Sequence, residues 1–146
     1  MGIIFLDAFA PRVMEKPAVE ITTFEFILVE ASFNTRKIIL LCVYRPPNTH
    51  IPTCIDEFQA LTLDLLDIGN QLPIAWDFNI PVNKSSPTTN DLLDTLNDLG
   101  FENTVEDPTF IRSGNTLDLV LDFYPNSFIR NTQVHSGPIG QFPCYL

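Results

Sequence analysis

The sequence predicts an α/β protein in which helices pack outside β-sheets. Apolar segments of strand length outnumber helical segments, and both helical segments stand between strand segments. A doubly wound parallel sheet is the alternative, but no glycine-rich phosphate loop follows any strand segment. The length of 146 residues fits one domain, and we expect residues 1–146 to form it.

The chain is expected to begin its main sheet with a β-hairpin. Residues 21–32 are rich in β-branched and aromatic types that alternate in part with polar ones, which is typical of a strand. Residues 37–45 are almost continuously apolar, as expected of a strand covered on both faces. Asn34 and Thr35 make the turn between these strands. Residues 46–48 end the second strand, because proline has no amide hydrogen to donate.

The first helix is predicted over residues 53–69. Thr53 is its expected N-cap, with Asp56 as capping-box partner, and Gly69 is its expected end. Apolar side chains recur on one face of this helix, at Ile55, Phe58, Leu61, Leu65 and Ile68.

A second helix is predicted over residues 90–99. Thr88 or Thr89 is the expected cap and Gly100 the expected stop. Its apolar face consists of Leu92, Leu93, Leu96 and Leu99. Strands are expected before and after this helix, at residues 72–78, 101–105, 116–123 and 128–135.

The net charge of −10 is concentrated in the middle of the chain. From Pro46 to Ile111 there are eleven acidic residues and one basic residue, Lys84. Such a surface repels phosphate backbones, and the basic stripe typical of nucleic-acid-binding proteins is missing. Contact with nucleic acid would then need a metal ion or a short local patch. The alternative is a solvated acidic face that keeps the protein in solution.

Cysteine usage and hydropathy limit the location of the protein. Cys42, Cys54 and Cys144 are widely spaced without a CxxC pair, which argues against a structural zinc site and favours a reduced, intracellular protein. Nucleus and cytoplasm are not distinguished. No apolar run reaches the roughly 18 residues of a membrane span. The first residues lack the basic region of a signal peptide, and no membrane association is expected.

Polar residues at the end of one strand are the first candidates for chemistry. Asp77 and Asn79 are two residues apart and therefore share a face of an extended chain. A carboxylate and an amide in one space can hold a hard cation and orient a water molecule. The alternative is an ordinary Asp/Asn turn after a strand.

Two further strands carry candidate residues. Tyr44 stands at a strand end, with Arg45 and Asn48 close by, and its hydroxyl can donate to a phosphate; the alternative is an ordinary half-buried tyrosine. Asp118 lies inside an apolar strand and needs a partner, because an unpaired buried carboxylate is costly. Asp122, on the same strand, is expected to be solvated.

Taken in order, these segments resemble the endonuclease/exonuclease/phosphatase superfamily, also called DNase I-like. The motifs are VYRPPN at 43–48, IAWDFNIPV at 74–82, a leucine-rich helix ending in glycine, DPTF at 107–110 and SGNTLDLVL at 113–121. More narrowly, the chain from Phe24 onward is similar to the endonuclease domain of non-LTR (LINE-type) retrotransposons. The resemblance implies a four-layer α/β sandwich that cleaves phosphodiesters with Mg²⁺, in this subgroup nicking DNA.

The resemblance also implies residue roles. Asp77 matches the carboxylate that aligns and activates the attacking water, and Asn79 matches the amide that contacts the scissile phosphate. This pair is also the expected Mg²⁺ site. Tyr44 matches the tyrosine that donates to the same phosphate.

Three other positions are matched around the substrate. Asp118 matches the carboxylate that orients the family's catalytic histidine. Thr109 occupies the family's phosphate-side threonine position, and Asn48 is expected to bind substrate.

Several family residues are missing from the matched positions. The family's first strand carries an asparagine and the next segment its main metal-binding glutamate; both would lie before Met1, so we expect a sandwich that is incomplete at the N-terminus. Ile139, Gly140 and Gln141 occupy the places of the family's Ser-Asp-His. Trp76 replaces a glycine and is expected at the mouth of the site.

These departures predict a nuclease fold with little or no activity. Losing one general acid–base group costs about 10²–10⁴ in rate, and losing metal carboxylates removes charge stabilisation from phosphoryl transfer. The competing hypotheses are a residual Mg²⁺ endonuclease with a replacement carboxylate (Asp7, Glu106 or Asp107), a non-catalytic protein-interaction domain, and a transposon remnant without a selected role. Exposed strand edges predict self-association, unless residues 2–9 fill the gap.

Overall fold

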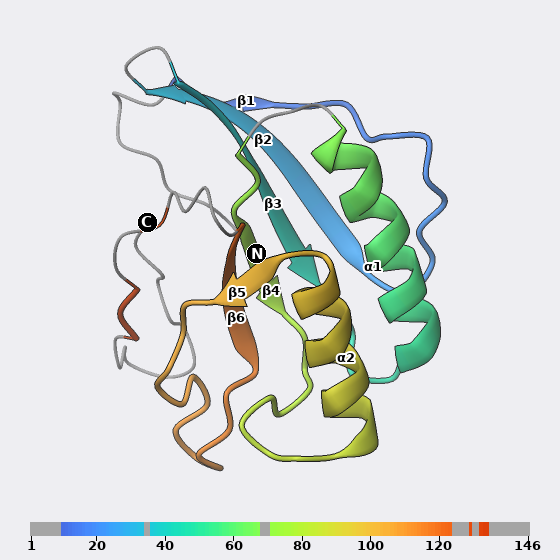
Figure 1. Cartoon of the computed structure of the whole chain (residues 1–146), viewed down its shortest axis with the longest axis vertical. Helices are drawn as coiled ribbons and strands as arrows, with labels where there is room; N and C mark the ends of the chain where they lie inside the picture. Colours follow the sequence, from blue (N-terminus) through green and yellow to red (C-terminus); the bar gives the residue numbers. More distant parts are fainter. Residues whose placement is uncertain (1–9, 34–35, 68–70, 124–128, 130–131, 135–146) are drawn as a thin grey trace.

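The computed structural model describes residues 10–33, 36–67, 71–123, 129 and 132–134. Within them, a six-stranded mixed sheet carries two helices on one face (Figure 1). The strand order is β1-β2-β3-β4-β6-β5, and only β3 and β4 pair in parallel. The bounds are β1 Arg12–Val13, β2 Glu25–Phe33, β3 Arg36–Tyr44, α1 Ile51–Leu66, β4 Ile74–Asp77, α2 Pro87–Asp98, β5 Phe101–Asn103 and β6 Asp118–Phe123.

The architecture confirms the predicted α/β class. One sheet and one helix layer lie within the described residues, which is half of a four-layer sandwich. The predicted segment 2–9, the turn at Asn34 and Thr35 and the helix end at Gly69 lie outside the described residues. Most of the predicted strand at 128–135 also lies outside them, and residues 129 and 132–134 are not in a strand.

The predicted β-hairpin is confirmed, although it begins later than expected. β2 and β3 pair antiparallel from Glu25 with Tyr44 to the turn. Residues 21–24 are not in the strand, because Glu57 of α1 holds this segment instead. Its carboxylate accepts the backbone N–H groups of Thr22 (3.1 Å) and Thr23 (3.0 Å) and both of their hydroxyls (2.6 Å each).

The start predicted for α1 is wrong by two residues. The N-cap is His50, not Thr53, and the His50 Nδ1 accepts the backbone N–H of Thr53 at 3.4 Å. Pro52 lies in the first turn, where the missing N–H of proline has no intrahelical partner in any case. The proline therefore belongs to the helix and not to the preceding loop.

The same error affects α2. Its N-cap is Ser86, not Thr88 or Thr89, and the Ser86 Oγ accepts the backbone N–H of Thr89 at 3.1 Å. Leu93, predicted on the buried face, is 38% exposed. The predicted stop is confirmed, since Gly100 follows the C-cap with φ +81°, a left-handed conformation that favours glycine.

Both faces of the sheet are buried. The face that packs against the helices includes Phe26, Leu28, Ile39, Leu41, Val43, Ile74, Trp76, Leu119 and Leu121. The opposite face is also apolar and buried, at Val29, Ala31, Ile38, Leu40, Cys42 and Val120. A sheet with two apolar faces is what a sandwich requires, because one face takes the helices and the other takes a second sheet.

The edges of the sheet are short strands. β1 has two residues and β5 has three, and short edge strands limit pairing with another chain. The short edges offer little backbone for self-association, which stays a prediction. Neither described helix has the length and apolar character needed to cross a bilayer.

Candidate functional site

A row of polar residues crosses three neighbouring strands at one end of the sheet. Tyr44 of β3 is paired with Asp77 of β4, and Asp77 is paired with Asp118 of β6. Paired residues of adjacent strands point to the same face. This face is the one away from the helices, because the chain neighbours of all three point into the helix-facing core: Val43, Trp76 and Leu119. The row therefore brings together three of the predicted site residues.

Glu25 extends this row, and the sequence analysis assigned it no role. Glu25 is exposed and pairs with Tyr44 in the hairpin, so the row reads Glu25, Tyr44, Asp77 and Asp118 across four strands. The hairpin could have indicated this position, since Glu25 and Tyr44 are equally far from the turn at 34–35. Glu25 lies two strands from Asp77, with Tyr44 between them.

Asn79 lies beside Asp77 in a left-handed turn, with φ +52°. Asparagine tolerates this conformation better than most residues. The backbone N–H of Asn79 donates to Asp77 Oδ1 at 3.2 Å, and its Nδ2 donates to the backbone oxygen of Arg45 at 2.8 Å. The structure therefore agrees with both interpretations of this pair, since it contains an Asp/Asn turn that also holds a carboxylate and an amide side by side.

Thr109 supports the row from behind. It is 1% exposed, and its Oγ1 accepts the backbone N–H groups of Leu117 at 2.9 Å and Asp118 at 3.1 Å. These bonds fix the chain as it enters β6 and so place Asp118. Asn48 is exposed in the turn after β3. Contact of Thr109 or Asn48 with a substrate stays a prediction.

Burial and three neighbouring groups shift the pKa of the Asp77 carboxyl group. Burial raises the pKa of Asp77, and the neighbouring Asp118 carboxylate raises it further. The Asn79 N–H and the Arg45 guanidinium act in the opposite direction and lower this pKa. A proton or a cation at this carboxylate would relieve the repulsion. Neither Glu106 nor Asp107, two of the predicted replacement carboxylates, is among the charges that shift the pKa, and Asp7 lies outside the described residues.

The donor set fits Mg²⁺ only weakly. Proteins hold Mg²⁺ by one or two carboxylates together with waters and substrate phosphates. Asp77 and Asp118, with the Asn79 Oδ1, supply that minimum. Within the described residues, no three His, Cys, Asp or Glu side chains lie close enough together to hold a metal ion.

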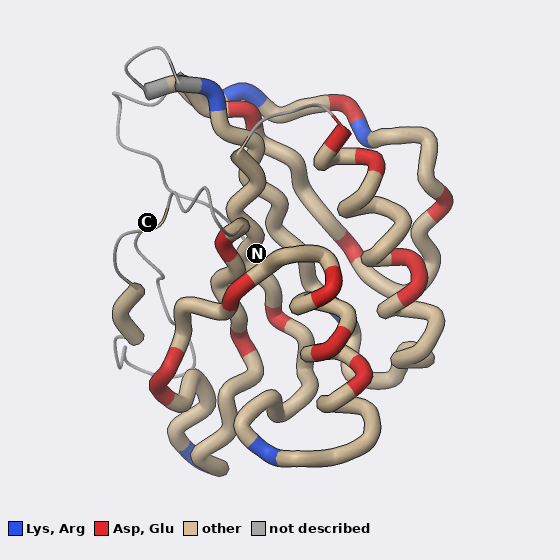
Figure 2. Tube along the Cα trace, viewed as in Figure 1, with Lys and Arg blue, Asp and Glu red and all other residues tan. Residues whose placement is uncertain are grey.

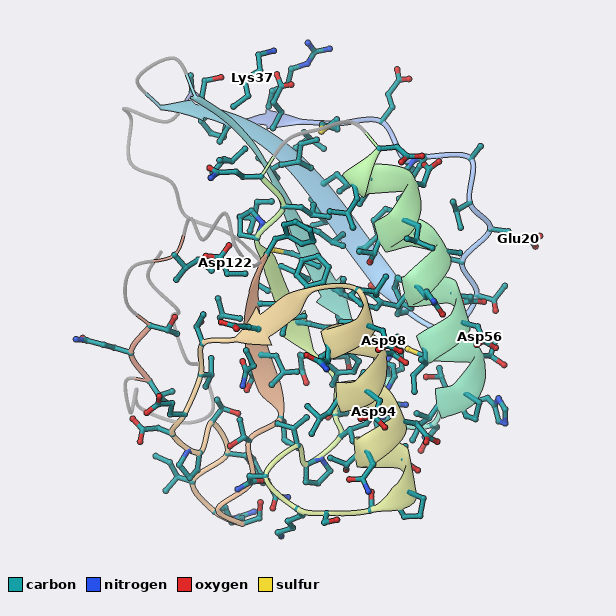
Figure 3. All side chains as sticks on the ribbon, in the orientation of Figure 1. Glu20, Lys37, Asp56, Asp94, Asp98 and Asp122 are labelled. Atoms are coloured by element: carbon teal, nitrogen blue, oxygen red, sulfur yellow. The ribbon has the colours of Figure 1, made fainter. Side chains whose placement is uncertain are left out.

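Two expectations close to the site are wrong. Trp76 does not lie at the mouth of the site, because it alternates with Asp77 along β4 and points into the helix-facing core. It is 2% exposed, and its ring centroid lies 3.2 Å from that of Phe78. Asp122 is not solvated: it is 2% exposed and accepts the backbone N–H groups of Phe123 at 3.0 Å and Ile129 at 2.6 Å (Figure 3).

Acidic side chains gather on the helix layer (Figures 2 and 3). Neither helix contains a lysine or an arginine. The exposed acids of this layer are Asp56, Asp64, Asp91, Asp94 and Asp98. They lie on the opposite face of the sheet from the Tyr44–Asp77–Asp118 row, so this part of the negative charge adds to the acids of the candidate site only from the other side of the sheet.

Two exposed basic residues lie on loops that hydrogen bonds hold together. Lys84 is on the loop after β4, and Arg112 is on the loop before β6. Asn83 joins these loops, because its Nδ2 donates to the Gly114 backbone oxygen at 2.7 Å and its Oδ1 accepts the Thr116 N–H at 3.0 Å. Lys84 and Arg112 are thus exposed bases on two loops that hydrogen bonds connect to each other.

Protein-family models and curated proteins give no match to this chain. Solved structures do match it. The endonuclease domain of TRAS1, a telomere-specific non-LTR retrotransposon, aligns with a TM-score of 0.69 and 18% identity, over 86% of this chain and 60% of that one. D. rerio TDP2, complexed with a single-strand DNA product, aligns with a TM-score of 0.51 and 7% identity, over 90% of this chain and 62% of that one.

These likenesses concern the fold. At 18% and 7% identity, they show that the chain has a DNase I-like fold, as its motifs predicted. The chain spans about three fifths of the length of each of these two structures. The resemblance to the endonuclease domain of non-LTR retrotransposons is thereby confirmed at the level of the fold.

Proposed function

We propose that this chain is a phosphodiesterase domain of the retrotransposon-endonuclease type that keeps its phosphate-facing residues and cleaves DNA slowly or not at all. The observation that carries the proposal is the meeting of Tyr44, Asp77 and Asp118 in one row, with Asn79 beside it. These residues come from three separate strands. Chemistry on a phosphate diester needs an acceptor for water and donors for the phosphate oxygens, and this row contains both kinds of group.

Each residue of the row has a role that its chemistry supports. Asp77 orients the attacking water and accepts its proton, and burial, together with the nearby Asp118 carboxylate, makes Asp77 a stronger base by raising its pKa. The Tyr44 hydroxyl and the Asn79 Nδ2 donate to the phosphate oxygens. Bound Mg²⁺, held by Asp77 and the Asn79 Oδ1, would neutralise charge on the phosphate.

The proposed site lacks a general acid for the leaving oxygen. Gln141 stands where the family has a histidine, and glutamine has no proton to give at neutral pH. His50 caps α1 and is committed there. Water must then protonate the leaving group, which costs about 10²–10⁴ in rate. Together with the weak metal site, this accounts for a domain that binds phosphate and turns over little.

DNA is the proposed partner, and it would approach the end of the sheet at which the Tyr44–Asp77–Asp118 row lies, because the rest of the face away from the helices is buried. Lys84 and Arg112 provide the local positive charge for that approach. A reduced, intracellular setting is part of the proposal, and it rests on the wide spacing of Cys42, Cys54 and Cys144 in the sequence.

Nicking of supercoiled plasmid by micromolar protein tests the proposal. With Mg²⁺ or Mn²⁺, we expect little or no nicking above the metal-free reaction. Calorimetric titration with Mn²⁺ should give weak binding that Asp77→Ala abolishes and that Asp64→Ala, an exposed acid of α1, preserves. Efficient nicking that Asp77→Ala removes would show an intact enzyme. Binding that survives Asp77→Ala would show that the row is not the metal site.

A non-catalytic protein-interaction domain is the second candidate. The helix layer favours it, because exposed acids without any lysine or arginine on α1 and α2 suit a basic protein surface. On this alternative, Asp77 is dispensable and Mn²⁺ titration gives no heat that depends on it. The same calorimetry therefore separates the two candidates.

A further inference from the structure

Arg45 is a buried cation without a carboxylate partner among the described residues. It is 1% exposed. Its Nε donates to the Phe78 backbone oxygen at 2.6 Å, its Nη2 to the Asn79 backbone oxygen at 3.3 Å, and its Nη1 to Thr49 O at 3.1 Å. Nη1 also reaches Pro46 O at 3.1 Å and Thr49 Oγ1 at 3.2 Å. The ion pair that the structure records in the described residues is Lys37–Glu30, elsewhere on the sheet.

These bonds join Arg45 to the turn that carries the candidate site. The Arg45 backbone N–H donates to Asp77 O at 3.1 Å, and Asn79 Nδ2 donates back to Arg45 O at 2.8 Å. With the two guanidinium bonds to Phe78 and Asn79, four hydrogen bonds connect one arginine to three consecutive residues. Arg45 therefore holds the left-handed conformation of Asn79 through two groups of this residue, the backbone carbonyl and the side-chain carboxamide.

We infer that Arg45 is a positioning residue: its buried guanidinium clasps the carbonyls of Phe78 and Asn79 and so fixes the turn that directs Asp77 and Asn79 at a substrate. The part about substrate rests on the proposed function; the clasp itself is tested without cleavage. Lysine cannot replace this residue, because an ammonium is a point charge and lacks the planar fork that reaches acceptors in several directions.

The positive charge of Arg45 has a second effect on the same site. The groups that act on the Asp77 carboxylate are Asp118 from β6, the Asn79 N–H from its own turn, and Arg45 from the end of β3. Arg45 lowers the pKa of Asp77 and opposes Asp118. The charge of Arg45 and its hydrogen bonds predict opposite effects on metal affinity. A nearby cation lowers the affinity by repelling the metal, whereas a correctly held turn raises it by positioning the ligands.

Arg45→Lys, Arg45→Gln and, as matched control, Arg12→Gln test the inference in the full chain. Arg12 of β1 is exposed, so the control removes the same charge outside the clasp. Mn²⁺ affinity at the Asp77 site is expected to fall about 10–100-fold in both Arg45 variants, as for lost orienting groups of metal ligands. NMR signals of the Asn79 side-chain amide should shift in both. Arg12→Gln should leave affinity and amide signals unchanged.

Tighter Mn²⁺ binding in Arg45→Gln would overturn the inference, because it would mean that Arg45 acts by charge alone. Unchanged Asn79 signals in a folded Arg45 variant would also overturn it. Should both Arg45 variants fail to fold, Thr49→Val removes one acceptor of Nη1 and is expected to shift the Asn79 amide signals to a smaller degree; an unshifted signal there counts against the clasp. A chain that binds no Mn²⁺ fails the proposed function, whereas the Asn79 signals still report on Arg45.

Discussion

Replacing Thr109 by valine tests how the sheet places Asp118. The Thr109 Oγ1 accepts two backbone N–H groups, from Leu117 and Asp118, at 2.9 and 3.1 Å, and the side chain is 1% exposed. Valine has nearly the same shape but offers no acceptor. Both N–H groups, which are partly buried, would then lose this acceptor.

The expected cost follows from these two bonds. A buried polar group left without a partner costs about 1–3 kcal/mol, so two such groups cost roughly 2–6 kcal/mol of unfolding free energy, and the partial burial of these two bonds favours the lower end. For a chain of this length, each kcal/mol corresponds to about 2–4 °C in Tm. Thr109→Val should therefore lower Tm by roughly 4–24 °C, with values near the lower end expected.

Denaturation in urea, followed by circular dichroism, measures this loss. Thr109→Ser is the matched control, because it keeps the acceptor and removes one methyl group; it should lose clearly less stability than the valine variant. Equal stability of the valine variant and the wild type would refute the reasoning, since it would mean that water or another group satisfies these N–H groups.

Three further predictions concern ionisable groups. Asp118→Asn should lower the pKa of Asp77, because the carboxylate that raises it is removed; an NMR titration that shows no fall contradicts the assigned repulsion. Asp77→Asn should raise Tm at pH 7, because the pKa of Asp77 is raised on folding. The contribution of Asp77 to stability is therefore complete only below the unfolded pKa of about 3.9. It is lost as pH rises through the folded value. Tm of the variant and the wild type should converge in acid, and a lower Tm at pH 7 argues against the assignment. Glu57→Gln should destabilise at pH 7, because four donors of Thr22 and Thr23 lower the pKa of Glu57. Its contribution is present above the unfolded pKa and is lost as pH falls through the folded one, so thermal melts should show the difference shrinking in acid.

The errors in the predicted elements have local causes. Both helices were predicted to begin after a proline, at residues 53 and 90, although the first helical turn tolerates proline and includes Pro52 and Pro87. Trp76 was expected at the mouth of the site because it replaces the family's glycine beside Asp77, whereas neighbours along a strand point to opposite faces. Asp122 was wrongly predicted to be solvated. Its burial could not be predicted locally, because one of its hydrogen-bond donors is Ile129, seven residues further along the chain.

The sequence by itself determined the α/β class, the hairpin, both helices and the Asp77–Asn79 pair, because periodicity and two-residue spacing are local properties of the chain. Only the tertiary structure decided that Tyr44, Asp77 and Asp118 form one row and that the acidic helices lie on the other face. It alone also revealed the Arg45 clasp, whose acceptors Phe78 and Asn79 lie 33 and 34 residues away. Strand register and burial arise from pairing between distant segments, and no pattern within a single segment contains that information.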